Sequence, residues 1–300
     1  MATAPSTSTA AATPLDEAAL RRPRQPIWQR IDRYLLPLFT LFAIGYLLVP
    51  IAVMIVFSFN LPDGKFNYAW NEFSLQGWLN PFAWPGLGNA VITSLVVAVV
   101  ATLGATVLGT LIGLALTRYR FRGRGLLNGF IFLPMATPEI VMGASLLTLF
   151  VATALPPLAG GVPLLYPTGF GTIVIAHIMF NISFVVVTVK ARLSGFDGRL
   201  EEAAMDLGAD ELTTFWKVTF PLILPGITAA ALLAFSLSID DFVITNFVSG
   251  TTNTFPIWVY SIQRNALPVQ INVVGSMVFL GAVGLVLISS LRSGGIPRLR

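Results

Sequence analysis

Three carboxylates interrupt long apolar runs of this chain and are well suited to hold a positive charge. Glu139 lies in one run, and Asp240 and Asp241 form an adjacent pair in another, next to Phe242. A charge at the centre of a bilayer costs roughly 3 kcal/mol or more, so such residues usually face a cavity or a partner. No Lys or Arg lies within these runs to neutralise them. Carboxylates beside an aromatic ring stabilise a cation by charge and cation–π contact, so these four residues are candidates for lining a pathway for a cation.

A structural role is the alternative for each acid. Asp240 and Asp241 can accept hydrogen bonds from backbone groups near a helix end. Adjacent helical residues point about 100° apart, so the two need not face the same way. Glu139 follows Pro134 and Pro138, and prolines free backbone carbonyls and kink helices. This helix is therefore expected to be able to bend, and Glu139 can equally cap a broken segment.

Catalytic chemistry has little support in the sequence. The chain has no cysteine and one histidine, His177, which excludes thiolate and multi-histidine metal sites. His177 and Asn181, one helical turn apart, are expected to hydrogen-bond across a helix interface. There is no G-x-x-x-x-G-K-[ST] phosphate loop and no credible nucleophile. We therefore predict no catalytic residue, no metal and no cofactor bound by this chain.

The elements that position these residues are membrane helices. Of the 300 residues, 55% are hydrophobic and only 11% charged, and the mean hydropathy is +0.79. This composition excludes a soluble enzyme, a nucleic-acid binder and a disordered scaffold. A bilayer-spanning helix needs roughly 20 apolar residues. An all-α integral-membrane fold with six spans is predicted: Tyr34–Phe59, Gly88–Thr117, Asn128–Ala152, Gly171–Val189, Ile223–Phe247 and Ile271–Leu291.

Charge sets the predicted orientation. All 18 Lys and Arg residues except Lys65 and Arg264 fall in the termini and in alternate loops, which places that side in the cytoplasm. Both termini are then cytoplasmic. Residues 1–33 form a predicted disordered cytoplasmic tail, because the Ala/Ser/Thr/Pro-rich start cannot pack a core. Residues 34–292 form the transmembrane domain, with a cytoplasmic loop at 190–221, and residues 293–300 form a C-terminal tail.

The loop at 190–221 is the longest charged segment between spans. We predict a first helix over Arg199–Leu207, stopped by Gly208, and a second helix capped by Asp210 that runs to Val218 and is ended by Pro221. The first helix offers a small apolar patch, flanked by acids that would meet a basic partner surface. Its patch and acids comprise Glu201, Glu202, Ala203, Ala204, Asp206 and Leu207. A solvated amphipathic loop is the alternative.

The spacing in this loop resembles a specific pattern. Glu202-Ala203-Ala204, three residues, Gly208, nine residues and then Val218-x-Phe220-Pro221 is similar to the EAA motif, E-A-A-x3-G-x9-I-x-L-P, of binding-protein-dependent ABC importer permeases. Val218 and Phe220 are conservative departures from it. The segments 118–147 and 234–250 resemble the polyamine (spermidine/putrescine) branch of that family, and the string S-I-D-D-F-V-I-T resembles its C-type permeases.

The resemblance implies a type I ABC importer permease (MetI-like) fold in the inner, or plasma, membrane of a prokaryote. It implies a B-type permease as heterodimeric partner, two ATPase subunits that bind ATP and Mg, and an extracytoplasmic substrate-binding protein. The coupling helix of the family docks on the ATPase, a role that the resemblance carries to Glu202, Ala203, Ala204 and Gly208. Membrane lipid is the remaining expected partner, and nucleic acid is not one.

Two other functions stay open at this point. The first is an ABC permease for another small solute, such as an iron complex, thiamine or an organic phosphate. Intramembrane acids suit a cation better than an anion, which would be expected to meet helix N-termini or basic side chains. The second is a stand-alone secondary transporter or channel. The coupling motif argues against it, because a self-sufficient carrier has no need of an ATPase-docking helix.

Overall fold

The structure is a computed structural model that describes residues 27–154, 168–195 and 197–292. It divides into two units, residues 1–55 and 56–300, which we describe separately. The first unit is built on helix α1 (Ile27–Phe57), which begins at Ile27 rather than at the predicted Tyr34. Within its apolar stretch Leu35–Phe57 most side chains are exposed on this chain, as expected for a surface that faces lipid or a partner. The rest of the predicted tail, residues 1–26, and the C-terminal tail lie outside the described residues.

The second unit opens with a short extramembrane hairpin that the all-α prediction missed. Strands β1 (Asn60–Leu61) and β2 (Glu72–Phe73) pair antiparallel, and the short helix α2 (Gln76–Leu79) follows. The Asn60 amide donates to Asn67 Oδ1 at 2.6 Å. The Phe59 ring stacks on Phe73, with 5.7 Å between ring centroids. Side-chain bonds and ring stacking therefore hold this hairpin, since two residues per strand provide little pairing of their own.

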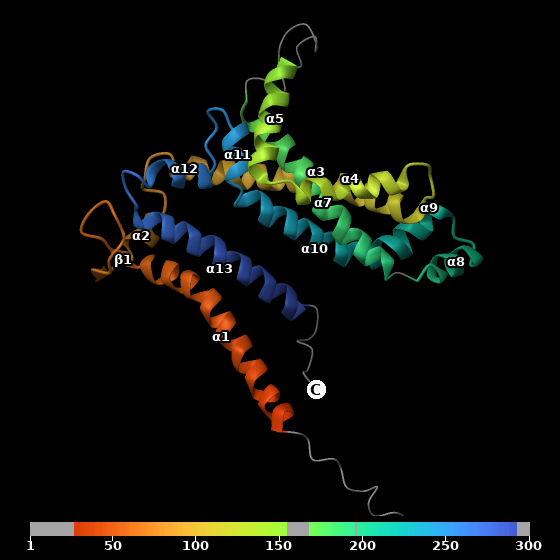
Figure 1. Ribbon diagram of the computed structural model, residues 1–300, viewed down its shortest axis with the longest axis horizontal. Coiled ribbons are helices and arrows are strands. Elements are labelled where there is room, and N and C mark those ends of the chain that lie inside the picture. Colours follow the sequence, from red (N-terminus) through yellow and green to blue (C-terminus); the bar gives the residue numbers. More distant parts are fainter. Residues whose placement is uncertain (1–26, 155–167, 196, 293–300) are drawn as a thin grey trace, which may run out of the picture. The chain divides into compact units, whose positions relative to one another are not determined.

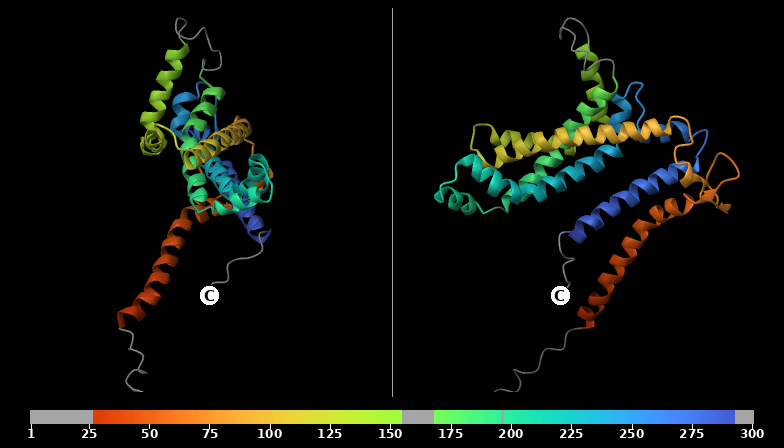
Figure 2. Two further views of the ribbon diagram at one scale, coloured as in Figure 1. Left: turned by 90° about the vertical axis from the view of Figure 1, so that its right-hand side faces the viewer. Right: turned by 180° about the vertical axis from the view of Figure 1, so that it is seen from behind.

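The remainder of the unit is helical (Figures 1 and 2). In chain order its helices are α3 (Leu87–Arg118), α4 (Arg124–Ala136), α5 (Glu139–Ala154), α7 (Phe170–Ser194), α8 (Arg199–Asp206), α9 (Glu211–Thr214), the π-helical turn η2 (Phe215–Thr219), α10 (Phe220–Ile239), α11 (Val243–Val248), α12 (Phe255–Ile262) and α13 (Val269–Arg292).

Helices α3, α7 and α10 pack on one another and form the core of the second unit. Glycines make the close approach of α3 and α7 possible. A Cβ at Gly109 would lie 2.6 Å from Cγ1 of Val185, and one at Gly113 would lie 3.3 Å from Cγ1 of Val189. Small residues at such crossings let helix backbones approach closely in membranes.

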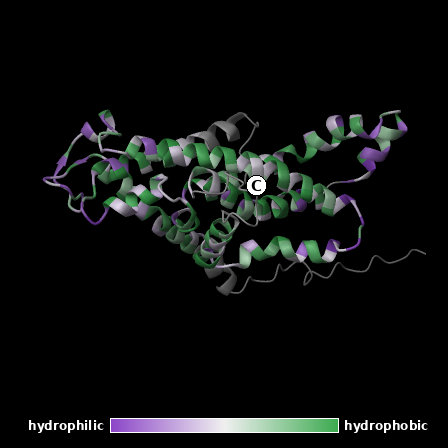
Figure 3. Ribbon diagram, turned by 90° about the horizontal axis from the view of Figure 1, so that it is seen from above, coloured by the Kyte–Doolittle hydropathy of each residue, from purple (hydrophilic) through white to green (hydrophobic). Residues whose placement is uncertain are grey.

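The six predicted spans are confirmed only in part. Within the described residues, four helical stretches are long and apolar enough to cross a membrane: Leu35–Phe57, Leu87–Arg118, Phe170–Ser194 and Glu211–Ile239. The hydropathy colouring of Figure 3 follows the apolar character of these helices. The predicted third span is two helices, α4 and α5, which meet at 106° around Thr137 and Pro138. Pro138 has no N–H and disfavours a helical residue before it, which explains the break.

The last two predicted spans also differ from the structure. The fifth ends at Ile239 rather than Phe247, because Asp240 and Asp241 interrupt it and α11 starts as a separate helix. The sixth corresponds to α13, a helix of 24 residues that contains the whole predicted segment Ile271–Leu291, although its described apolar stretch is limited to Val269–Gly284. The predicted count of six is therefore not confirmed.

Candidate functional site

The first helix predicted in the loop at 190–221 is confirmed as α8 (Arg199–Asp206), which ends one residue before the predicted Leu207. Gly208 N donates to the Met205 carbonyl at 2.9 Å, and Ala209 N donates to the Ala204 carbonyl at 3.1 Å. Gly208 has φ +89°, so these bonds form the pattern by which a left-handed residue closes a helix. A Cβ at Gly208 would meet nothing within 4 Å. The glycine of the motif is therefore required here by backbone conformation and not by lack of space.

The second helix of the loop starts as predicted but does not stop as predicted. Asp210 Oδ1 accepts from Thr213 N at 3.0 Å and caps α9, and hydrogen bonds from Thr213 lower the pKa of the Asp210 carboxyl. The helix then passes through the π turn η2 into α10 without a break, so the expected end at Pro221 is wrong. Pro221 directly follows the π turn, so the backbone bond that it cannot donate falls where the regular α-helical pattern is already interrupted.

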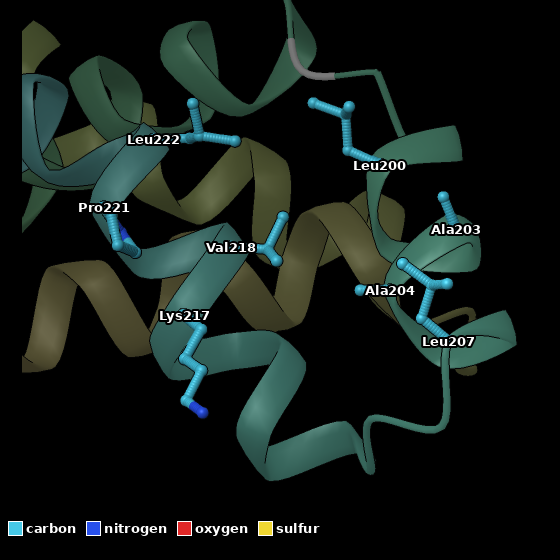
Figure 4. A pocket seen from close by; sticks show the side chains of 8 residues that line it. All are labelled: Leu200, Ala203, Ala204, Leu207, Lys217, Val218, Pro221 and Leu222. Carbon is cyan, nitrogen blue, oxygen red and sulfur yellow. The ribbon is translucent and has the colours of Figure 1, made fainter.

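The two halves of the motif meet in one apolar groove. Its walls come from α8 on one side and from η2 and the start of α10 on the other, and its volume is about 540 Å³ (Figure 4). It is lined by Leu200, Ala203, Ala204, Leu207, Lys217, Val218, Pro221 and Leu222. The nine-residue spacing between Gly208 and Val218 thus folds the second half of the motif back against the first.

Helix α8 has an outer and an inner face. Leu207 is 91% exposed, and Glu202, Ala203 and Asp206 are also exposed. Glu201 instead turns inward, where its carboxylate pairs with the Arg118 guanidinium and accepts from the Thr219 hydroxyl. The acids predicted to act together on one partner surface are therefore divided, with Glu201 committed to this chain.

The two adjacent aspartates also have different environments. Asp241 Oδ2 accepts from Thr245 N at 2.8 Å and from Thr245 Oγ1 at 2.6 Å, and Oδ1 accepts from Ile244 N at 3.4 Å. Its side chain is 6% exposed, and it caps the first turn of α11. Asp240, the preceding residue, is exposed. The structure thus places Asp241 inside the subunit and Asp240 at its surface.

His177 joins this polar cluster from α7. Its Nδ1 lies 2.6 Å from Ser238 Oγ, and its Nε2 lies 2.9 Å from Thr245 Oγ1. Thr245 donates its hydroxyl proton to Asp241, so its oxygen accepts from Nε2–H of His177. Both ring nitrogens of His177 therefore have a hydroxyl partner. The expected interhelical bonding of His177 is confirmed.

Three polar residues of this cluster and its surroundings differ from what the sequence indicated. Both amide atoms of the buried Asn181 lack a hydrogen-bond partner among the described residues, so its expected bond is not found. Ser238 and Thr245, which bond to His177, were not predicted. In the sequence they are marked only by a hydroxyl side chain on either side of the Asp240–Asp241 pair. Hydroxyl residues are too common for this to predict a role.

The other two pathway candidates are Phe242 and Glu139. The Phe242 ring lies 4.8 Å from the Tyr260 ring of α12, centroid to centroid. Glu139 is exposed at the first residue of α5. One turn later on the same helix, a Cβ at Gly143 would lie 2.6 Å from the Phe247 ring of α11, so α5 and α11 are in close contact. Within the described part of the chain, no hydrogen bond or ion pair joins Glu139 to either aspartate.

A packed helical core, and a loop at 190–221 that brings both halves of the EAA-like pattern into one groove, are the arrangement expected of a membrane permease. The family model "Binding-protein-dependent transport system inner membrane component" matches residues 105–294. The chain belongs to this family of transport permeases.

Individual polyamine permeases are similar to this chain over most of its length. The chain is 36% identical over 248 residues to the "Spermidine/putrescine transport system permease protein PotC" of Haemophilus influenzae, covering 82% of this chain and 91% of the relative. It is 37% identical to the PotC protein of Escherichia coli strain K12, covering 82% and 89%. It is 38% identical to the "Putrescine transport system permease protein PotI" of the same strain, covering 80% and 84%.

Among solved structures, a chain of a bacterial ABC transporter involved in the import of the acidic polysaccharide alginate superposes with a TM-score of 0.64. The match covers 87% of this chain and 95% of that chain, at 16% identity. At this identity the likeness shows a shared ABC importer permease fold. It carries no information on the solute.

Proposed function

We propose that this chain is a transmembrane permease subunit of an ATP-driven importer for polyamines, of the spermidine and putrescine class. The observation that carries the proposal is the 36–38% identity over about four fifths of the chain to three polyamine permeases. The resemblance of the segment around Asp240 and Asp241 to C-type polyamine permeases points the same way. An importer for another solute, or a stand-alone carrier, has no comparable support.

The proposal includes a complex around this chain. A second, B-type permease completes the pathway as a heterodimer, two ATPase subunits bind ATP and Mg, and an extracytoplasmic binding protein delivers the solute. The chain itself contributes no catalytic group. Both of its termini and helix α8 lie on the cytoplasmic side, which is supported by the distribution of Lys and Arg between its loops.

Helix α8 is the proposed docking element for the ATPase. Its outer face combines the exposed Leu207 with the carboxylates of Glu202 and Asp206, next to the apolar groove. The apolar tip and groove would be buried by a partner, and the acids would pair with basic groups of that partner. Ala203 and Ala204 have small side chains, which allow a partner to approach the helix closely.

Asp240 is the proposed ammonium contact in the pathway. It is exposed where the fifth spanning helix ends, whereas the Asp241 side chain is occupied by three hydrogen bonds from α11. Phe242, two residues after Asp240, packs its ring against Tyr260 and supplies aromatic surface for a cation. Glu139, also exposed, is the second acid proposed to face the pathway.

Uptake of labelled spermidine and putrescine tests the solute. Cells that encode this gene are compared with a deletion strain and with the deletion strain carrying the gene. We expect uptake to fall on deletion and to return with the gene. Unchanged uptake in a deletion strain that has no other polyamine importer would contradict the polyamine assignment. It would leave the permease family intact, because that rests on residues 105–294 as a whole.

A further inference from the structure

A polar junction links the proposed docking helix to two membrane helices. Glu201, the third residue of α8, pairs with Arg118 at the C-terminal end of α3. The same carboxylate oxygen accepts from the hydroxyl of Thr219, the last residue of η2. Arg118 Nη2 also lies 3.3 Å from Thr219 Oγ1, which closes the triangle. Three elements that are distant in sequence thus meet at one carboxylate.

This junction is a charge-assisted side-chain contact between α8 and the end of α3. Gly198 precedes α8 and Gly208 follows it, and a Cβ at either glycine would meet nothing within 4 Å. The groove side of α8 is open. The Arg118 and Glu201 side chains are only 33% and 20% exposed, so their charge-assisted bonds are partly shielded from water. Such bonds are roughly twice as strong as neutral ones.

Further contacts join the start of α10 to α7 in the core of the second unit. Arg192, at the cytoplasmic end of α7, donates from Nε and Nη2 to the Leu222 carbonyl of α10 at 3.2 and 3.0 Å. Its methylene groups lie over Gly226, where an added Cβ would be 2.6 Å from Cγ of Arg192. Helix α7 in turn packs on α3 through Gly109 and Gly113. A displacement applied at Glu201 therefore reaches α3, α10 and α7 together.

We infer that Arg118 and Thr219 are positioning residues for energy coupling, which pass movement of α8 to α3 and α10 through Glu201. The inference rests on the proposed docking role of α8. Without the junction, a partner that moves α8 would bend its open glycine-flanked ends and leave the membrane helices behind. Arg118 thus has a role beyond the orientation of the chain in the membrane, which a count of basic residues suggests for it.

The first test compares the variants Arg118→Gln and Arg120→Gln. Arg120 lies two residues beyond Arg118, after the end of α3, is exposed and has no side-chain hydrogen bond within the described part of the chain, so it is the matched control. The complete importer is purified with each variant, and three quantities are measured: co-purified ATPase, ATP hydrolysis, and polyamine transported into proteoliposomes. We expect Arg118→Gln to retain the ATPase and its hydrolysis but to transport about tenfold less solute per ATP, the equivalent of one lost charge-assisted bond. Arg120→Gln should match the wild type.

The double variant Arg118→Glu with Glu201→Arg adds a rescue. It restores an opposite-charge pair, so the amount of solute per ATP should recover toward the wild-type value. Equal solute per ATP in Arg118→Gln and Arg120→Gln would overturn the inference. Loss of the ATPase from the Arg118→Gln complex would also overturn it, because the pair would then serve assembly and not transmission.

A second measurement is independent of the transported solute. The chain contains no cysteine, so Met205→Cys on α8 and Arg122→Cys beyond α3 can be spin-labelled selectively. Both positions are exposed. We expect a narrow distance distribution in the parent and a clearly broader one when Arg118→Gln is added. An unchanged distribution would overturn the junction even if polyamine uptake is established, and a broadened one would support it even if the solute proves to be another.

Discussion

His177 Nε2 lies 3.3 Å from Asp241 Oδ2, close to the end of α10. The histidine belongs to α7, and the aspartate caps α11, so the pair joins two helices at a break in a third. Both side chains are almost fully buried. Burial of polar groups costs free energy unless their hydrogen bonds are made, and here Ser238 and Thr245 complete them. The break is therefore a fixed structural feature of the subunit.

Replacement of Asp241 is expected to destabilise the subunit. Asp241→Ala removes the acceptor for Thr245 and Ile244 and leaves buried donors unpaired, which costs roughly 1–3 kcal/mol. A lower midpoint of thermal unfolding in detergent is the expected readout. Asp240→Ala, at the adjacent exposed position, is the control and should unfold close to the wild-type temperature. Equal midpoints for the two variants would contradict the division of roles between these aspartates.

Replacement of Asp240 is expected to affect transport without affecting stability. Asp240→Asn removes a carboxylate from the proposed pathway, and we expect about tenfold lower maximal uptake of spermidine, the equivalent of roughly 1.4 kcal/mol. The concentration for half-maximal uptake should change little if the proposed external binding protein captures the solute first. Asp240→Glu keeps the charge and should retain most of the rate. Wild-type uptake kinetics in Asp240→Asn would remove this residue from the pathway.

Gly208 is expected to tolerate only residues that accept a positive φ. Gly208→Ala places a side chain in the left-handed conformation, at a cost of about 1 kcal/mol, and should loosen the C-terminal end of α8. Gly208→Asn should be milder, since asparagine adopts this conformation more readily. Co-purification of the ATPase, compared between the two variants, measures the effect. If asparagine were as harmful as alanine, lack of space at a docked partner, and not backbone conformation, would explain the glycine.

Close packing of α3 on α7 gives a further prediction. Gly109→Ala introduces a Cβ within 2.6 Å of Val185, and overpacking of this kind costs about 1–3 kcal/mol. The thermal midpoint of the purified subunit should fall accordingly. Gly129→Ala on α4, where a Cβ meets nothing within 4 Å, provides the control and should be neutral or slightly stabilising. An unaffected midpoint in Gly109→Ala would mean that the two helices separate easily.

Local features of the site could be predicted from sequence, because their causes are local. The ends of α8, the Asp210 cap and the bend at Pro138 each follow from one or two residues and their neighbours. The end at Pro221 was wrong, because a π turn is not marked by any residue type in its sequence.

Pairings between distant segments could not be predicted in the same way. Arg118 and Glu201 lie on separate helices, and no spacing relates them. In the sequence, Arg118 is one of several basic residues on the predicted cytoplasmic side. Glu201 is one of several acids on α8. The short β1–β2 hairpin could not be predicted for a similar reason. It is held by asparagine amides and stacked rings and not by an alternating pattern of apolar and polar residues.

The π turn at Phe215–Thr219 has a consequence for how this segment tolerates change in length. A π turn holds about one residue more than an α turn, so the faces of the helix before and after it are offset by about 100°. That offset lets one continuous helix present Lys217 and Val218 to the groove beside α8 and still direct the buried face of α10 into the core. Removal of a single residue here would rotate one of these surfaces out of place. The segment is thus sensitive to the number of its residues as well as to their identity.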